Sequence, residues 1–249
     1  MKRITILTIF PDMFTGFLDT SIIKKARLKG LVDISAVDFR PFTDDKHNRV
    51  DDYPFGGGQG MVLRCQPLLD ALAKVRRPES HVVLMDPTGT RFDQEKAHQL
   101  QEDYDDMVIM CGHYEGYDDR ITAHADELIS IGDYILTGGE LGAMVVTDAV
   151  TRLVPGVITD ESSMFESFED GLLEYPQYTR PEEYDGVRVP DVLLSGHHEN
   201  IRRWRLYQSL LRTWRQRPDL LAGRIFTKEE AAMMAEIRAL PPEEQKGKE

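Results

Sequence analysis

The alternation of apolar, β-branched runs with helix-like stretches most constrains how this chain can fold. Five runs read as strands, over residues 4–10, 32–39, 81–86, 107–112 and 127–132. Between them lie helix-like stretches such as residues 66–76, which Pro67 can open at the first turn, and residues 94–102. Because strands alternate with helices, we expect an α/β domain with a mainly parallel sheet over residues 1–160.

The sequence changes character after residue 159. Residues 159–169 are polar, acidic and without a clear period, so we expect a flexible linker over residues 161–175. Apolar residues then recur at spacings of three or four, at Ile201, Trp204, Tyr207, Leu211 and Trp214. Pro218 ends that helix, and Thr227 with Glu230 has the spacing of a capping box for a last helix. A small helical domain over residues 176–249 is therefore expected.

Charge and cysteine content exclude several classes of protein. The net charge of −13 argues against a general polyanion binder, because phosphate contacts are made mainly by Lys and Arg. Residues 197–217 nevertheless hold six arginines against one acid, which suits a partner of one defined shape. Two cysteines, Cys65 and Cys111, give no disulfide framework, and no apolar run approaches the ~20 residues that span a bilayer. We expect a cytoplasmic protein without a membrane partner.

Three of the predicted strands end in loops that contain glycine, at residues 86–89, 112–116 and 132–140. In open parallel sheets, ligands bind at the carboxyl ends of the strands, where glycine lets the backbone approach them closely. A single loop of this kind usually has only a structural role, but three such loops on one sheet edge predict a ligand site. Composition alone does not name the ligand.

The glycine-rich run at residues 56–60 does not fit a nucleotide-phosphate loop. It lacks the Gly-Lys-Ser/Thr ending of a P-loop, and Met61 stands where G-x-G-x-x-G requires glycine. Asp51 and Asp52 beside it would repel phosphate. As a bare motif this run is a mobile loop or hinge.

Five longer motifs identify a family. They are VDDYPFGGGQGM at residues 50–61, CGHYEG at 111–116, SIGDYILTGGE at 130–140, YTRP at 178–181 and LSGHH at 194–198. In sequence and in order they resemble the TrmD-type bacterial tRNA (guanine-N1)-methyltransferases, and the match is collinear from about residue 4 to about residue 240.

The resemblance implies a fold and an activity that composition does not reveal. It implies a SPOUT-type α/β domain whose C-terminal part is threaded into a trefoil knot, although knots are rare in proteins. It also implies a homodimer whose active sites are shared between subunits. The implied activity is S-adenosylmethionine-dependent methylation of N1 of the guanosine immediately 3′ of the anticodon of tRNA (position 37), which supports maintenance of the reading frame.

Site residues follow from the same resemblance, position by position. Those that match the donor-contacting positions are Leu84, Pro87, Gly112, Tyr114, Glu115, Ile131, Gly132, Asp133, Tyr134, Ile135, Leu136, Gly138 and Gly139. Those expected to contact the substrate guanine or the rest of the tRNA are Asp51, Gly57, Gly58, His197, Arg202 and Arg203. The family also suggests Mg²⁺, but the sequence offers no clear ligand cluster, so we assign no metal-binding residue.

The chemistry requires a base, because N1 of guanine carries a proton that must leave as the methyl group arrives. The resemblance assigns this role to a linker aspartate followed by Ser-Phe, and Glu166 stands at that position here. Its extra methylene displaces the carboxylate by over an ångström, and Glu169 and Asp170 are nearby alternatives. Arg152 matches the arginine expected near the exocyclic oxygen of guanine, where negative charge develops. Without the resemblance, an ordinary surface salt bridge explains Arg152 equally well.

Three alternatives remain open at this point. One is a SPOUT methyltransferase that modifies another nucleotide or a ribose 2′-oxygen. Another is a tRNA-binding protein that lost its activity when the aspartate became Glu166. The third is a nucleotide-binding regulator that uses the glycine-rich run, although the P-loop lysine is missing.

Overall fold

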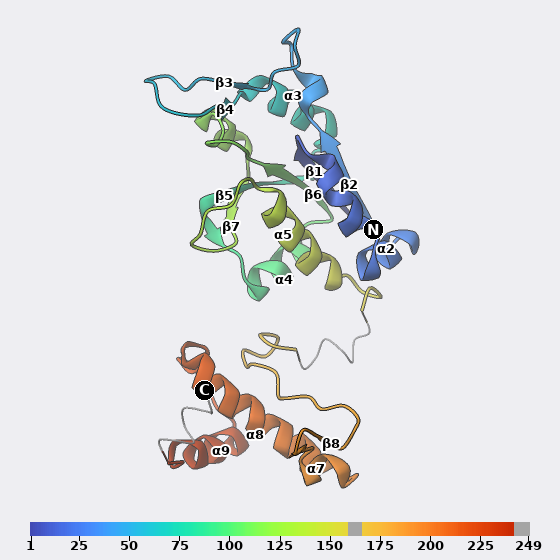
Figure 1. Cartoon of the computed structure of the whole chain (residues 1–249), viewed down its shortest axis with the longest axis vertical. Coiled ribbons are helices and arrows are strands. Elements are labelled where there is room, and N and C mark those ends of the chain that lie inside the picture. The colour runs from blue at the N-terminus through green and yellow to red at the C-terminus, as the bar shows by residue number, and fades with distance from the viewer. Residues whose placement is uncertain (159–165, 242–249) are drawn as a thin grey trace. The chain divides into compact units, whose positions relative to one another are not determined.

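Five parallel strands form the sheet on which the N-terminal part of the chain is built (Figure 1). They are β1 (Lys2–Thr8), β2 (Val32–Asp38), β5 (His81–Arg91), β6 (Asp106–Cys111) and β7 (Glu127–Ser130), in the spatial order β2-β1-β6-β5-β7. This computed structural model describes residues 1–158 and 166–241. All five predicted strands are present, and the central parallel sheet confirms the α/β fold class.

Side chains alternate along the strands, and each face of the sheet buries its own cluster. On β6, Met107 and Ile109 point to one face, whereas Val108 and Met110 point to the other. The first face is covered by α2 (Ser21–Leu28), α4 (Gln94–Asp103) and α5 (Glu140–Arg152). The second face is covered by α3 (Cys65–Val75) and the 3-10 helix η3 (Asp119–His124). The remaining short elements of this part are η1 (Pro11–Phe14), α1 (Thr15–Leu18), η2 (Arg40–Phe42), β3 (Asp51–Asp52) and β4 (Val62–Leu63).

Helix α4 has a polar partner at each end. The side chain of Asp93 accepts a hydrogen bond from the backbone N–H of Lys96 at 2.9 Å, which satisfies a donor of the first turn. At the other end, Nζ of the buried Lys2 donates to the carbonyl oxygens of Leu100 and Gln101 at 3.0 and 2.7 Å. The first strand of the sheet is thereby tied to the end of the helix that precedes β6.

Strand β5 continues beyond its predicted end at residue 86, after a bulge. Ile129 of β7 pairs with both Met85 and Thr90, so residues 86–89 form an extra segment between the two pairings. Gly89 closes this segment against β7, where a Cβ atom would lie only 2.4 Å from the carbonyl carbon of Leu128. The bulge turns residues 86 and 87 away from the sheet.

Contacts divide the chain into two units, Met1–Asp160 and Glu161–Glu249. The second unit contains β8 (Glu183–Tyr184), β9 (Val187–Arg188), α7 (Asp191–Leu194), α8 (His198–Gln216), η4 (Pro218–Leu221) and α9 (Lys228–Arg238). Its core packs α8 against α9 through residues such as Leu210 and Met233. The side chain of Thr227 and that of Glu230 form the predicted capping box at the start of α9.

The predicted linker is only partly described, because residues 159–165 lie outside the described part of the chain. Leu172, which falls within the predicted linker, is buried in the core of the second unit. The backbone N–H of Leu173 donates to the hydroxyl of Thr213 in α8 at 2.9 Å. In residues 1–158 and 166–241, the structure has no helix that is long and apolar enough to cross a membrane.

Candidate functional site

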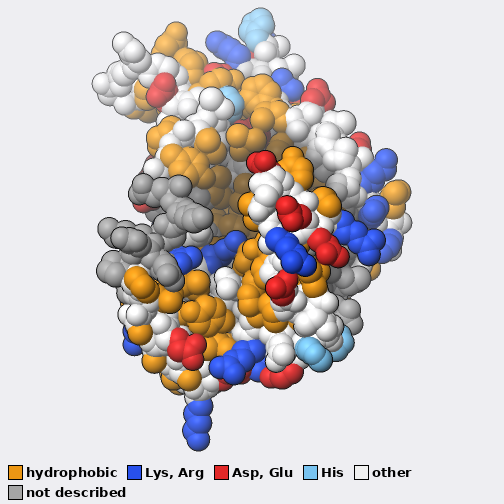
Figure 2. Space-filling view, turned by 60° about the horizontal axis from the view of Figure 1, so that its bottom comes forward, with side chains coloured by type: hydrophobic (Ala, Val, Ile, Leu, Met, Phe, Trp, Pro, Cys, Tyr) orange, Lys and Arg blue, Asp and Glu red, His pale blue; other side chains and the backbone are white. Residues whose placement is uncertain are grey.

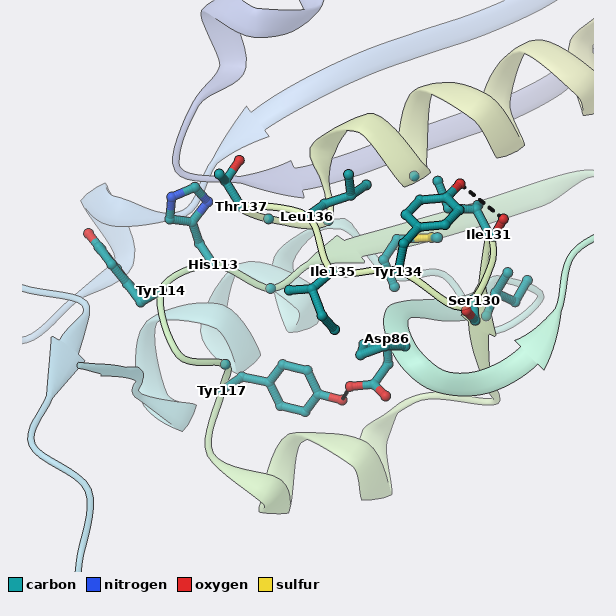
Figure 3. Close-up of a pocket in the computed structure, with 18 of the residues that line it drawn as sticks. Asp86, His113, Tyr114, Tyr117, Ser130, Ile131, Tyr134, Ile135, Leu136 and Thr137 are labelled. Atoms are coloured by element: carbon teal, nitrogen blue, oxygen red, sulfur yellow. Dashed lines mark hydrogen bonds between the residues drawn. The ribbon is translucent and has the colours of Figure 1, made fainter. Parts of the chain in front are cut away.

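A cavity of about 260 Å³ lies at the carboxyl ends of β5, β6 and β7 (Figure 3). Its wall is made by the bulge within β5, by the loops that follow β6 and β7, and by the first turn of α5. The lining residues are Met85, Asp86, Pro87, Gly112, His113, Tyr114, Glu115, Gly116, Tyr117, Ile129, Ser130, Ile131, Gly132, Tyr134, Ile135, Leu136, Thr137, Gly138, Gly139 and Gly142. The three predicted glycine-containing loops therefore meet at one site.

Backbone contacts hold the loop after β7 against the loop after β6. The N–H of Gly139 donates to the carbonyl oxygen of Gly112 at 2.8 Å, and His113 forms an antiparallel bridge with Gly138. The hydroxyl of Tyr134 donates to the carbonyl oxygen of Ile131 at 3.2 Å, which folds the segment back on itself (Figure 3). These contacts fix the shape of the wall before any ligand binds.

Two of the lining glycines lie where a side chain would crowd its neighbours. A Cβ atom on Gly138 would lie 2.3 Å from both Oε2 of Glu140 and Nδ1 of His113. On Gly139 it would lie 3.0 Å from Cα of Cys111 and from Cβ of Met85. The backbone of this segment thus passes close to the end of β6.

Asp86 contributes a fixed carboxylate to the cavity wall. The backbone N–H of Thr88 donates to one of its oxygens at 2.7 Å, and the hydroxyl of Tyr117 donates to the other. Burial raises the pKa of Asp86, but the hydrogen bonds from Thr88 and Tyr117 outweigh it and leave the pKa below its ordinary value. Burial and the bond to Asp86 raise the pKa of Tyr117, so the phenol stays protonated. The pair carries one negative charge at neutral pH.

A second carboxylate, Glu140, lies behind the lining in the first turn of α5. Its side chain is 2% exposed, and one of its oxygens accepts a hydrogen bond from the hydroxyl of Thr8 at 2.9 Å. The other oxygen lies 3.5 Å from Nδ1 of His113, whose ring also contacts the ring of Phe10. A carboxylate at this position also offsets the positive end of the α5 dipole. Glu140 thereby links the end of β1 to the lining of the cavity.

All of the predicted donor-binding residues line this cavity except Leu84 and Asp133. Leu84 is fully buried on the sheet face that packs against α3, one position before the cavity-facing Met85. Asp133 is exposed on the loop after β7, outside the lining. Donor contact by these two residues stays a prediction without support from the cavity.

The glycine-rich run is tied to the cavity through β4. The N–H of Leu63 donates to the carbonyl oxygen of Gly116 at 3.0 Å, and Asp51 pairs with Leu63 across the β3-β4 ladder. Burial raises the pKa of the Tyr114 phenol, and the charge of the nearby Asp51 raises it further. The other two predicted guanine-contacting residues, Gly57 and Gly58, are exposed and do not line the cavity.

The two predicted catalytic residues belong to different units. Arg152 is the last residue of α5 in the first unit, whereas Glu166 lies at the start of the described part of the second. The structure describes each within its own unit, so their meeting in one site stays a prediction.

The predicted tRNA-binding residues lie on or beside α8. His197 is exposed at the N-cap position, and Arg203 is exposed six residues further along. Arg202 is already engaged, because its guanidinium donates to both Glu199 and Glu229 at 2.8 Å. Basic and acidic side chains lie next to each other at several places on the face shown in Figure 2. The positive charge of Arg202 is therefore balanced locally by two acids.

No individual role was assigned from sequence to four residues of the site, Asp86, His113, Tyr117 and Glu140, although three of them lie in the loops predicted to hold a ligand at residues 86–89, 112–116 and 132–140. His113 and Glu140 stand inside recognised motifs, so the motifs themselves were the available signal. The contact between Tyr117 and Asp86 joins residues 31 positions apart and has no local signature. Within residues 1–158 and 166–241, no group of three His, Cys, Asp or Glu side chains could hold a metal ion, so no step is assigned to Mg²⁺.

The fold is that of an α/β protein with a cavity at the carboxyl ends of its parallel strands, the place where proteins of this class bind their ligands. The model of the family described as "tRNA (Guanine-1)-methyltransferase TrmD" matches residues 1–223 of the chain. A Halalkalibacterium halodurans protein named tRNA (guanine-N(1)-)-methyltransferase is 54% identical over 95% of this chain and 98% of its own length. A Dictyoglomus turgidum protein of the same name is 50% identical over 96% of this chain and 97% of its own length. The chain belongs to the TrmD family of tRNA (guanine-1)-methyltransferases.

Proposed function

We propose that this protein is the enzyme that methylates N1 of the guanosine immediately 3′ of the anticodon, position 37 of tRNA, with S-adenosylmethionine as donor. One observation carries the proposal: residues from two separate family motifs, at 111–116 and 130–140, line a single cavity at the strand ends together with the bulge of β5. The alternative of a catalytically silent tRNA-binding protein has no structural observation in its favour.

The cavity suits the adenosyl part of the donor. Apolar side chains such as Pro87, Ile135 and Leu136 can cover the faces of a purine ring, while peptide groups beside Gly138 and Gly139 can bond its edge. S-adenosylmethionine supplies an electrophilic methyl group on its sulfonium sulfur. The chain's own contribution is a wall preorganised by the hydrogen bond between Gly139 and Gly112.

A trefoil knot is part of the proposal, and the path of the chain supports it. Strand β7 lies at the sheet edge beyond β5, whereas α5, which follows β7, packs on β1 and β6. The intervening segment must therefore return across the sheet ends, and it touches the loop after β6 at Gly112. A chain that returns through this loop forms a knot.

We also propose a homodimer with shared active sites, in the cytoplasm. Ile135 at the cavity is 82% exposed, and Leu141 and Val145 expose about half of their side chains one turn apart on α5. Apolar side chains gathered in this way are typical of a surface that another subunit covers.

For catalysis, we propose that the carboxylate of Glu166 accepts the proton from N1 of guanine while Arg152 stabilises negative charge at the exocyclic oxygen. Asp51, Gly57 and Gly58 shape the guanine pocket. His197, Arg202 and Arg203 hold the tRNA, and Arg202 exchanges Glu199 and Glu229 for phosphate as it binds.

The substrate is tested with labelled S-adenosylmethionine and two tRNA transcripts that carry guanosine or adenosine at position 37. We expect label only in the first, at N1 of guanine after digestion. Label at another nucleotide or on ribose would replace the proposed substrate, and tRNA binding without any label would favour the silent-binder reading.

The base is tested by single-turnover methyl transfer. Glu166→Gln should lower the rate by roughly 100-fold or more, since the variant cannot accept the proton. Glu166→Asp should keep most of the rate. Glu169→Gln, at the neighbouring acid, should stay within a few-fold of wild type, and the reverse pattern would move the role to Glu169.

A further inference from the structure

Asp86 places a rigid negative charge on the cavity wall. The β5 bulge turns this residue out of the sheet, and Tyr117 and Thr88 hold its two carboxylate oxygens. In Figure 3 the hydroxyl of Tyr117 points at Asp86 along one side of the cavity, with Ile135 beside the pair. Because both partners are hydrogen-bond donors, they stabilise the ionised form.

The rest of the described lining does not cancel this charge. Glu115 is a second acid in the lining, and no Lys or Arg occurs among the lining residues that the structure describes. The nearest positive partial charge, the N-terminus of α5, is offset by Glu140 in its first turn. The cavity is therefore biased toward a cation.

From this placement we infer that Asp86 makes the cavity select its ligand by charge, favouring a sulfonium cation over the corresponding neutral thioether. The inference rests on the proposed function, in which the ligand is S-adenosylmethionine. The donor and its product, S-adenosylhomocysteine, share the base, the ribose and the amino-acid part, and differ by one methyl group with one positive charge at sulfur. Asp86 is thus a specificity-determining residue that favours the donor over the product and eases product release.

The size of the effect follows from the size of the cavity. We consider a ligand charge that sits about 8 Å from the carboxylate, a separation on the scale of this cavity of about 260 Å³. At an effective dielectric constant of about 40, between those of the protein interior and water, one charge pair at this separation changes an affinity roughly three- to tenfold. Steric effects of the methyl group are the same in wild type and variant, so they cancel in the comparison.

The test is calorimetric binding of three ligands to the full chain and its variants. The ligands are S-adenosylmethionine, S-adenosylhomocysteine and sinefungin, in which a carbon-bound ammonium group replaces the methylsulfonium centre. The variant is Asp86→Asn, which keeps the shape of the side chain. The control is Asp119→Asn, which removes an equal charge from an exposed position near Tyr117 but outside the cavity lining.

We expect Asp86→Asn to weaken the two cationic ligands about three- to tenfold. S-adenosylhomocysteine should change less than about twofold, and its retained binding shows that the cavity is folded. Asp119→Asn should leave the ratio of donor to product affinity unchanged. Equal losses for all three ligands would mean that Asp86 bonds a shared group such as a ribose hydroxyl, which overturns charge selection, and so would no loss at all.

The proposed function is checked separately by methyl transfer to tRNA. A wild-type protein that methylates tRNA but shows an unchanged affinity ratio in Asp86→Asn refutes the charge selection alone. A wild-type protein that binds none of the three ligands and transfers no methyl group refutes both.

Discussion

The close approach of Gly89 to β7 gives the sharpest test of how the cavity is built. A Cβ atom at this position would lie 2.4 to 2.5 Å from the carbonyl carbon and oxygen of Leu128 and the nitrogen of Ile129. All three are backbone atoms of a paired strand, so no side-chain rotation can relieve the overlap. The substitution Gly89→Ala must therefore push β7 away from β5, together with Ser130 and Ile131, which line the cavity.

Forced overpacking of this kind costs about 3 kcal/mol of unfolding free energy. For a protein of this size, we expect the melting temperature of the first unit to fall by about 6–12 °C. Affinity for S-adenosylmethionine should fall at least about tenfold, because a shift of an ångström breaks short hydrogen bonds in the wall.

The control for this experiment is Gly16→Ala. Gly16 lies in α1, has nothing within 4 Å of a Cβ atom and has no left-handed backbone. Alanine there should leave stability unchanged or raise it by up to about 1 kcal/mol. Melting is followed by circular dichroism; both tryptophans, Trp204 and Trp214, lie in the second unit and report on that unit separately. A Gly89→Ala protein that melts and binds the donor as Gly16→Ala does would refute the argument.

Two further predictions concern stability. Asp106 is 3% exposed and accepts hydrogen bonds from Arg3 and Ser80 at 2.8 and 2.7 Å. Burial raises the pKa of Asp106, but these hydrogen bonds outweigh burial, so the pKa lies below its ordinary value. Because the folded-state pKa is depressed, this stabilisation is present above the unfolded pKa of about 3.9 and is lost as the pH falls through the folded value. Asp106→Asn should thus cost about 3 kcal/mol at pH 7 and progressively less below pH ~4, in urea titrations; a constant difference would contradict the assignment. Thr227→Ala removes half of the capping box of α9 and should cost about 1 kcal/mol by tryptophan fluorescence, whereas Thr227→Ser should cost little.

The strands could be predicted because each is an apolar, β-branched run bounded by loop residues. The continuation of β5 to Arg91 could not be predicted, because it depends on Ile129 of β7 pairing with both Met85 and Thr90. Helix α5 was not delimited from sequence, because its stretch follows two glycines and is rich in β-branched residues. Burial of Ala143, Val146 and Val150 against the sheet holds it, and such packing overrides local propensity.

The family motifs coincide with the strand ends, and most of the predicted donor-binding residues line the cavity, but which residues of a strand face the cavity was not considered from sequence. Leu84 and Met85 are neighbours in one predicted segment, yet only Met85 faces the cavity. Alternation along the strand was the signal that could have separated them. Contacts such as that of Thr8 with Glu140 join residues from opposite ends of the sequence of the first unit, and no local sequence pattern predicts them.

The place of β1 inside the sheet has a consequence for synthesis on the ribosome. This strand is made first, but one of its neighbours, β6, ends only at Cys111, and helix α5, which covers the face bearing Ile4 and Ile6, ends at Arg152. A nascent chain shorter than this exposes an unpaired strand edge and an apolar sheet face, which are the features that promote aggregation. We therefore expect slow or interrupted translation before residue 152 to increase this protein's need for chaperones, and a truncation after β7 to be poorly soluble.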